Sequence, residues 1–448
     1  MNAHPTSALR EIVPRYTSYP TAPHFHAGIG ESQSKEWLSQ LESGSTVSLY
    51  VHVPFCDKLC WFCACHTKHT RHYKPVADFL VALHEEIRLV SPLLPSGVRV
   101  NAIHFGGGSP TMLHPHDLVH LVGMIRSSLY VERTVSLSVE IDPNDMDEQR
   151  LDALAVSGLT RASFGVQDFD PKVQNAINRM QSFELTRHVV EGVRARGTVS
   201  VNLDLLYGLP HQTVASVAET VRLALTLRPE RIALFGYAHV PWFKKHQTMI
   251  DEASLPDAEQ RFAQSRKAAA IITAGGYEPI GIDHFALPGD SLSEAFRGRR
   301  LRRNFQGYTD DRCETLIGLG PSSISRYRQG YVQNITATGE YEKAVFAGRL
   351  PVSRGIEFSR DDLATAWLIE RLMCDFEFSA EELVQRFGDC GQSLLAKATR
   401  LAREEPEKLL LDDDRFIVPP TQRPLVRTIA ARFDQYLQRG ALRHSVAV

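Results

Sequence analysis

Six short apolar runs alternate with helical patterns between about residues 47 and 282, and this alternation most constrains the fold. The runs read VSLYVHV, VNAIHF, VSLSVEI, RASFGV, VSVNLDLLYG and RIALFGYA. Such alternation is typical of a parallel sheet, because each helix carries the chain back to the same edge. Six units predict an α/β fold, an incomplete parallel (β/α)6 barrel with functional residues at the carboxyl ends of its strands.

Four cysteines follow the first run within ten positions, at Cys56, Cys60, Cys63 and Cys65. Three thiolates from one short loop can hold three irons of a [4Fe-4S] cluster and leave the fourth iron open. An open iron at low potential can pass one electron to a bound sulfonium and so generate a carbon radical. The loop therefore predicts radical chemistry driven by S-adenosylmethionine (SAM). Three ligands suffice for this, so Cys65 has either a second role or none.

Zinc and disulfides are the alternatives for these cysteines. A structural zinc site usually joins two separated knuckles, whereas all four thiols here share one loop. The seven cysteines of the chain are an odd number for paired bridges, and the opening sequence MNAHPTSALREIVPRY lacks the apolar core of a signal peptide. We therefore expect reduced cysteines and a cytoplasmic protein.

Two regions flank the barrel, which is expected at residues 46–350. Residues 1–45 are rich in proline and hydroxyl side chains and predict an irregular arm over the active site. Residues 351–448 predict a mainly helical domain with a short strand pair at LLLDDDRFIVPP. This end resembles a winged-helix module, but the net charge is only −2 and no basic stripe accompanies it, so no nucleic-acid partner is expected. No apolar stretch is long enough to span a membrane.

Glycine and polar residues stand at the ends of the later runs. A triple glycine at 106–108 allows a ligand to approach the backbone closely. Glu140, Gln167 and Asp204 are expected to close three successive strands, which favours a polar cofactor at that rim. Arg179 could pair bidentately with the methionine carboxylate of SAM.

Tyr50 and Phe62 flank the cysteine loop. Aromatic rings there could shield an adenosyl radical, or they could pack under the loop as part of the core. The residue pattern leaves both interpretations open.

Ordered motifs along almost the whole chain resemble one known family. They read PRYTSYPTA, YVHVPFCDKLCWFCAC, FGGGSPT, EIDP, FGVQDF, NLDLLYGLP, YAHVP, GIDHFA, RRNFQGYT and GLGPSSIS. On these motifs the chain resembles the oxygen-independent coproporphyrinogen III oxidases, which are oxidoreductases of the radical SAM superfamily. The resemblance implies that the propionates on rings A and B of coproporphyrinogen III are decarboxylated to vinyl groups, giving protoporphyrinogen IX in haem biosynthesis. A 5′-deoxyadenosyl radical is implied to abstract the hydrogen.

The resemblance also implies the cofactors and the residues that contact them. It implies one [4Fe-4S] cluster held by Cys56, Cys60 and Cys63, and two molecules of SAM. The residues expected at the first SAM are Tyr50, Phe62, Gly106, Gly107, Gly108, Glu140, Gln167, Arg179, Asp204 and Ala238. The residues expected at the second are Phe305, Gln306 and Ile324. The candidate catalytic residues are Tyr50, Cys65 and Glu140.

Partners follow from the implied reaction. A substrate with four carboxylates needs cationic residues at the barrel mouth, and the candidates are Arg15, Arg297, Arg299, Arg300, Arg302 and Arg303, each equally well explained as a solvated basic residue. A low-potential donor such as flavodoxin or ferredoxin and an unidentified electron acceptor are expected, and the chain is expected to be a monomer. The alternatives are a haem-binding carrier of the same fold without oxidase activity and, ranked third, a haem-degrading or methylating radical enzyme.

Overall fold

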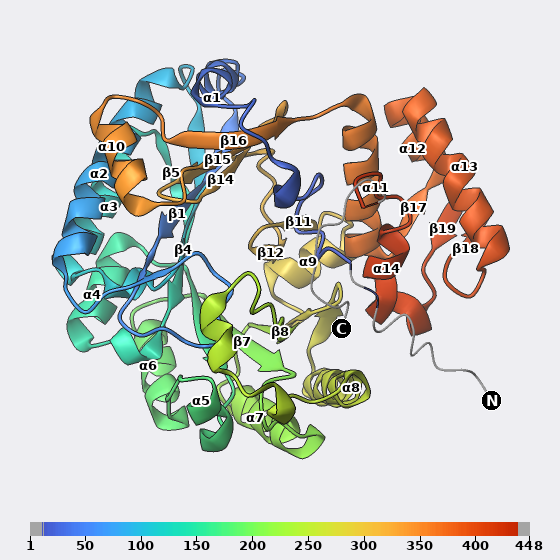
Figure 1. Cartoon of the computed structure of the whole chain (residues 1–448), viewed down its shortest axis with the longest axis horizontal. Coiled ribbons are helices and arrows are strands. Elements are labelled where there is room, and N and C mark those ends of the chain that lie inside the picture. Colours follow the sequence, from blue (N-terminus) through green and yellow to red (C-terminus); the bar gives the residue numbers. More distant parts are fainter. Residues whose placement is uncertain (1–10, 12, 438–448) are drawn as a thin grey trace.

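The computed structural model describes residues 11 and 13–437, and its centre is one large twisted sheet (Figure 1). The six predicted strands are β1 (Thr46–Val53), β4 (Arg99–Gly107), β5 (Val131–Ile141), β6 (Arg161–Gln167), β7 (Ser200–Tyr207) and β8 (Arg231–Gly236). They pair in chain order, each parallel to the next. The predicted α/β class and the order of its parallel strands are confirmed.

Further strands extend this sheet at both edges, and the sequence did not predict them. β13 (Thr315–Leu319) pairs parallel with β1. The remaining strands of the sheet are antiparallel to their neighbours: β14 (Ile324–Arg326), β15 (Gly330–Asn334) and β16 (Val352–Glu357) beyond β13, with β10 (His284–Ala286) and β9 (Glu278–Ile280) beyond β8. The end strands β16 and β9 do not pair with each other, so the barrel is open as predicted.

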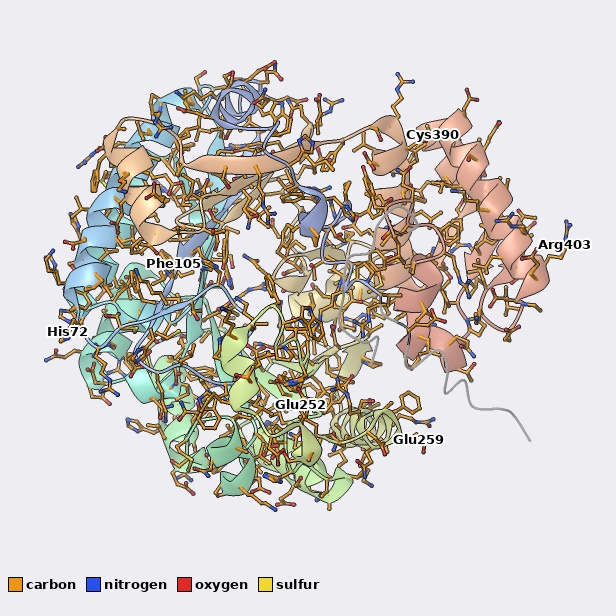
Figure 2. All side chains as sticks on the ribbon, viewed as in Figure 1. His72, Phe105, Glu252, Glu259, Cys390 and Arg403 are labelled. Atoms are coloured by element: carbon orange, nitrogen blue, oxygen red, sulfur yellow. The ribbon has the colours of Figure 1, made fainter. Side chains whose placement is uncertain are left out.

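An outer layer of helices covers the sheet (Figure 1). Its members are α2 (Lys74–Val90), α3 (Pro115–Ser128), α4 (Glu148–Ser157), α5 (Pro171–Ala176), α6 (Phe183–Ala195), α7 (Val214–Thr226) and α8 (Ala258–Ala274). Pro75 and Pro115 lie in first turns, where a missing N–H costs nothing, and α4 ends at Gly158 with a left-handed φ of 89°. Phe105 of β4 is fully buried in the core between these layers (Figure 2). Among the described residues, no helix is both long and apolar enough to cross a lipid bilayer.

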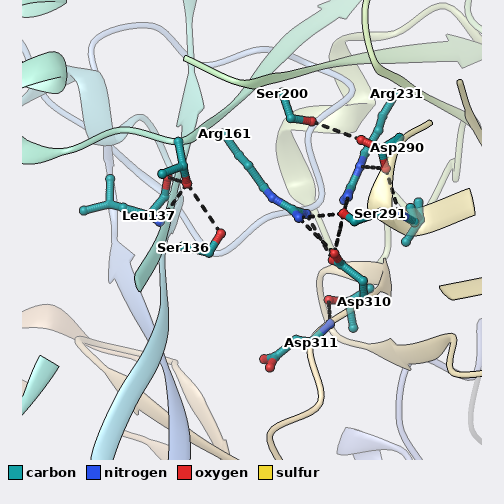
Figure 3. Close-up of polar contacts among 12 residues, drawn as sticks. Ser136, Leu137, Arg161, Ser200, Arg231, Asp290, Ser291, Asp310 and Asp311 are labelled. Carbon is teal, nitrogen blue, oxygen red and sulfur yellow. Dashed lines mark hydrogen bonds and ion pairs between the residues drawn. The ribbon is translucent and has the colours of Figure 1, made fainter. Parts of the chain in front are cut away.

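Ion pairs connect the amino ends of β6 and β8 to the segments around Asp290 and Asp310 (Figure 3). Arg161 begins β6 and its Nη2 lies 2.9 Å from Asp310 Oδ2, while Arg231 begins β8 and its Nε lies 2.8 Å from Asp290 Oδ1. The hydroxyl of Ser291 accepts from both arginines and donates to Asp310. Because this network lies opposite the carboxyl ends of the strands, its role is to stabilise the fold.

The region before β1 departs from the predicted irregular arm, because it contains the helix α1 (Glu31–Ser39). The N–H of Gly30 donates to Gln33 Oε1 over 3.0 Å, and Trp37 and Leu38 are buried. The sequence did not predict this helix, because it is short and follows a proline-rich run that is typical of irregular structure. The described residues before α1, 11 and 13–30, are irregular apart from one helical turn at Ala22–His24 and a bridge from His26 to Gly355.

After β16, the chain up to residue 437 is mainly helical and lies to the right of the sheet in Figure 1. Its elements are α11 (Arg360–Asp375), β17 (Glu377–Ser379), α12 (Ala380–Phe387), α13 (Asp389–Glu404), β18 (Leu410–Asp412), β19 (Arg415–Ile417) and α14 (Val426–Ala430). The predicted strand pair is β18 and β19, and β17 adds a third strand. Ser379 caps α12 by accepting the N–H of Glu382. Val13, Tyr16 and Tyr19 of the arm pack into the apolar core of this region.

Candidate active site

The cysteine loop leaves the carboxyl end of β1 and is closed by a small parallel pair, β2 (Phe55–Cys56) and β3 (Lys68–His69). Cys56, Cys60 and Cys63 are partly exposed, and Cys65 is exposed. The thiols are therefore accessible to a metal cofactor at the rim where barrels of this type carry their function.

Residues after α5 hold one side of the loop. The N–H of Trp61 donates to Ile177 O over 3.0 Å, and Asn178 Nδ2 donates to Leu59 O over 2.9 Å. These bonds fix the backbone on either side of Cys60.

A segment after β8 holds the other side of the loop, and the sequence did not reveal this contact. Gln247 Nε2 donates to Phe62 O over 2.9 Å, and His246 Nε2 lies 2.7 Å from Cys63 O. Lys244 Nζ donates to Cys65 O over 2.8 Å. In the sequence, these three residues belong to a polar stretch after β8, and nothing in that stretch indicates a contact with the cysteines.

Arg179 lies beside the thiol of Cys60, with 3.5 Å between Nη1 and Sγ. Its Nη1 also lies 2.8 Å from Asp142 Oδ2, and its Nε and Nη2 donate to Gly165 O. Burial raises the pKa of Cys60, and the Arg179 cation opposes that rise. Every nitrogen of this guanidinium has a protein partner, so its observed role is to join the loop to two strands. Its predicted contact with SAM stays a prediction.

Tyr50, His104 and Glu140 come from three neighbouring strands. The Tyr50 and His104 rings stack with centroids 5.8 Å apart and 17° between their planes. Glu140 Oε1 lies 3.3 Å from His104 Nε2, and Oε2 accepts the N–H of Gly107 over 3.2 Å. Burial opposes ionisation of Glu140, yet these hydrogen bonds lower its pKa. The sequence analysis missed His104, although its position two residues before Gly106 places it on the same face of β4.

The triple glycine ends β4 against the cysteine loop. A Cβ at Gly106 would lie 2.7 Å from Glu140 Oε1, and a Cβ at Gly108 would lie 2.3 Å from Phe55 O. Gly107 has a φ of 110°, which side chains rarely adopt. Each glycine is thus explained by a close approach within the protein, and the predicted contacts with SAM stay predictions.

Asp204 lies inside β7 and not at its end, because the strand continues to Tyr207, so the expected position was wrong. Its carboxylate accepts from Ser163 over 3.2 Å and from Asn202 over 2.8 Å. Burial, together with the Glu140 charge, raises the pKa of Asp204 to about 6. Gln167 does end β6, in a left-handed conformation with a φ of 67°.

Gln247 also joins two of the predicted SAM residues. Its Nε2 donates to Phe62 O on the cysteine loop and, over 3.2 Å, to Ala238 O just after β8. The Phe62 side chain packs against the buried cluster that contains Ile177 and Tyr237. The structure therefore brings Phe62 and Ala238 together, with Phe62 contributing to packing.

The residues predicted for a second SAM come from two parts of the structure. Phe305 and Ile324 contact one apolar cluster, where the Phe305 ring is 5.8 Å from that of Tyr331. Gly318 of β13 pairs with Tyr50, and a Cβ at Gly318 would lie 2.9 Å from Ile324 O. Ile324 and Tyr50 thus lie on either side of β13, whereas Phe305 and Gln306 lie in the turn of a separate strand pair that contacts Ile324 through this apolar cluster.

Three comparisons with known proteins agree with this geometry. Residues 50–224 match the Radical SAM superfamily. The oxygen-independent coproporphyrinogen III oxidase of Paracoccus denitrificans is 48% identical over 97% of this chain and 96% of its own length. The chain belongs to the oxygen-independent coproporphyrinogen III oxidases. The enzyme of the same description from Bradyrhizobium diazoefficiens is 46% identical over 98% of both chains. A solved structure of coproporphyrinogen III oxidase from Escherichia coli, described as a radical SAM enzyme, has a TM-score of 0.89 and 34% identity and covers 95% of this chain and 100% of its own.

Membership of this family implies a [4Fe-4S] cluster and SAM, and the donor set fits the cluster. The thiols of Cys60 and Cys63 both act electrostatically on Cys56, so the three lie near one another. Each of three neighbouring thiolates can bind its own iron, so this donor set fits a [4Fe-4S] cluster with one iron left open.

The arginines expected at the barrel mouth are mostly engaged within the protein. Gln306, in the turn between β11 (Arg302–Asn304) and β12 (Gly307–Thr309), is exposed. The ion pairs of the arginines before it are Arg297 with Glu278, Arg299 with Glu377, Arg302 with Glu370 and Arg303 with Asp283. Arg297, Arg299 and Arg302 are thus closely paired with an acid, which weakens their assignment to an anionic substrate, whereas Arg303 lies 3.6 Å from its acid.

Proposed function

We propose that this chain converts the propionates on rings A and B of coproporphyrinogen III to vinyl groups without oxygen, giving protoporphyrinogen IX. The observation that carries the proposal is the similarity to the oxygen-independent coproporphyrinogen III oxidase of Paracoccus denitrificans over 97% of the chain. This similarity includes the arm and the helical end as well as the Radical SAM region. The accessible cysteine loop at the carboxyl end of β1 supports the same chemistry.

The reaction needs a radical because the β C–H bond of a propionate is unactivated, and no side chain near neutral pH can remove that hydrogen as a proton. When bound, the cluster and SAM supply a 5′-deoxyadenosyl radical that takes it. Loss of carbon dioxide and one electron from the substrate then leaves the vinyl group, and an external acceptor takes the electron.

The residues of the chain bind and position these groups. Cys56, Cys60 and Cys63 hold the cluster, and the bonds from Asn178 and Gln247 fix the loop that carries them. The positions of Tyr50 and Ile324 on either side of β13 support two molecules of SAM, which suits two decarboxylations. One molecule lies at the Tyr50 and Glu140 side, and the other at the side of Phe305, Gln306 and Ile324.

The flanking regions complete the site. The proposed division is an arm at 1–45 over the active site, the barrel at 46–350 and a helical domain at 351–448. Arg15 donates to Gly236 O at the end of β8, and His26 bridges to Gly355 on β16, so the arm contacts both halves of the sheet. A low-potential donor such as flavodoxin or ferredoxin reduces the cluster, and the protein acts as a cytoplasmic monomer.

The test is an anaerobic incubation of the reconstituted protein with coproporphyrinogen III, SAM and a low-potential reductant. We expect vinyl products by liquid chromatography and mass spectrometry, and none with Cys60→Ser. Haem binding without any vinyl product would favour the carrier instead, and conversion of haem to a linear tetrapyrrole would favour a degrading enzyme.

A further inference from the structure

Four arginines from four separate segments converge at the carboxyl ends of β7 and β8. They are Arg15 of the arm, Arg261 of α8, Arg303 of β11 and Arg427 of α14. Arg15 Nη2 donates over 2.9 Å to the last carbonyl of β8, and Arg303 Nη2 donates over 3.5 Å to the carbonyl of Arg15. Arg261 Nη2 donates over 2.7 Å to the carbonyl that follows β8. Arg427 acts electrostatically on Arg15 and Arg303, which places it in the same group.

The carboxylate of Asp283 acts on three of these arginines, Arg15, Arg303 and Arg427. Asp283 Oδ2 lies 3.6 Å from Arg303 Nη2, and its Oδ1 is engaged by His284 over 2.7 Å. The other titratable groups that act on these arginines include the hydroxyls of Tyr207, Tyr237 and Tyr308 and the thiol of Cys374. Three cations therefore share the charge of this one carboxylate.

Several N–H groups of the arginine group lack a partner among the residues that the structure describes. The buried and unpaired atoms are Arg261 Nε, Arg303 Nε, Arg303 Nη1 and Arg427 Nε. The Arg303 side chain is only 4% exposed. Desolvation, with repulsion from Arg15 and Arg303, lowers the pKa of Arg427 to about 10, which leaves it charged near neutral pH. Unpaired donors and mutual repulsion are both relieved by a bound anion.

Three of the four arginines are at least partly open to solvent, at the rim of the sheet that also carries the proposed active site. The Arg15 side chain is exposed, and Arg261 and Arg427 are partly exposed. β7 and β8 end at the same rim of the sheet as β1, which leads into the cysteine loop. His284, the partner of Asp283, also acts on Asp204 of β7, so the two sites adjoin.

We propose that Arg15, Arg261, Arg303 and Arg427 form a subsite that binds a propionate carboxylate of the tetrapyrrole substrate. This inference rests on the proposed function. Guanidinium groups match the planar geometry of a carboxylate and donate paired hydrogen bonds to it. Arg15 comes from the arm and Arg427 from the helical end. The subsite therefore needs both flanking regions, and the barrel alone could not form it.

Arg427→Gln tests the subsite, because this side chain makes no hydrogen bond or ion pair with the residues that the structure describes. We expect the KM for coproporphyrinogen III and the Kd for coproporphyrin III to rise about 10- to 100-fold, as loss of one charge-assisted carboxylate contact predicts. Cluster iron, the thermal midpoint and SAM cleavage without substrate should stay at wild-type values. Arg427→Lys should restore part of the affinity.

Two further variants keep the test decisive. Arg15→Gln removes a second charge whose side chain makes one hydrogen bond, to a carbonyl, and should weaken binding similarly if Arg427→Gln fails to fold. Arg297→Gln is the matched control, because its ion pair with Glu278 is surface-exposed, and it should leave KM and Kd unchanged.

The outcomes separate this inference from the proposed function. Vinyl product from the wild type together with unchanged KM and Kd in Arg427→Gln and Arg15→Gln would overturn the subsite alone. Absence of vinyl product from the wild type, with coproporphyrin III binding that still depends on Arg427 and Arg15, would overturn the function and leave the subsite standing. Equal weakening by Arg297→Gln would show a general charge effect and would also reject the subsite.

Discussion

Gly108→Ala tests whether the close contact between the residue after β4 and Phe55 of β2 is needed to hold the cysteine loop. A Cβ at Gly108 would lie 2.3 Å from Phe55 O, whereas ordinary contacts begin at 3.4 Å, so the two backbones must separate by about 1 Å. The separation strains two hydrogen bonds, from Gly108 N to Val53 O and from Ser109 N to Phe55 O, both 2.7 Å long.

The cost follows from these contacts. Each strained hydrogen bond contributes about 1 kcal/mol and overpacking costs about 1–3 kcal/mol, so the free energy of unfolding should fall by about 3–5 kcal/mol. Phe55 directly precedes Cys56, and the displacement therefore reaches a predicted cluster ligand. We expect less iron and less acid-labile sulfide per chain after anaerobic reconstitution, and a lower thermal midpoint.

Gly123→Ala is the matched control, because a Cβ there has no neighbour within 4 Å. Gly123 lies inside α3, where alanine is favoured over glycine by about 0.5–1 kcal/mol, so this variant should keep its iron and its stability. Wild-type iron content and midpoint in Gly108→Ala would refute the argument.

Three further predictions concern the ligands, the ion pairs and the pH dependence. Cys60→Ser should remove cluster iron and SAM cleavage, whereas Cys65→Ser should keep most of the iron; equal loss in an iron assay would contradict the three-ligand assignment. Arg161→Met should lower the free energy of unfolding by about 2 kcal/mol in a denaturant titration, because its ion pair with Asp310 is partly buried. The control Lys343→Met removes an exposed ion pair and should leave the free energy of unfolding unchanged. Burial raises the pKa of Glu86 to about 7, so the folded chain keeps a proton that the unfolded chain releases near pH ~4.3. Stability should therefore decline by about 4 kcal/mol as pH rises between these two values and stay level above them. Thermal midpoints against pH should show that decline in the wild type and not in Glu86→Gln.

The parallel strands could be predicted because each is a continuous apolar run of the right length. β1 is buried on both faces over most of its length, and β7 alternates between buried and half-buried residues, so both sequences show a strand pattern without reference to the rest of the chain. β9, β10 and β14 have only three residues each, and their pairing depends on neighbours distant in sequence. Their local sequence contains too little pattern to predict a strand.

The candidate site divides in the same way. The cysteine spacing and the residues near strand ends were visible because they depend on local order in the chain. His246 and Gln247 bind the cysteine loop across more than 180 residues, and the partner of Arg303 depends on how distant strands fold together. Such contacts depend on the tertiary structure, and the local pattern of one sequence does not reveal them.

The central claim is that a hydrogen atom leaves the β carbon of a substrate propionate at this site. The most direct measurement uses coproporphyrinogen III deuterated at the β positions, with mass spectrometry of the 5′-deoxyadenosine released during anaerobic turnover. We predict deuterium in 5′-deoxyadenosine, formed together with the vinyl product. Vinyl product accompanied by 5′-deoxyadenosine that never acquires deuterium would contradict the account.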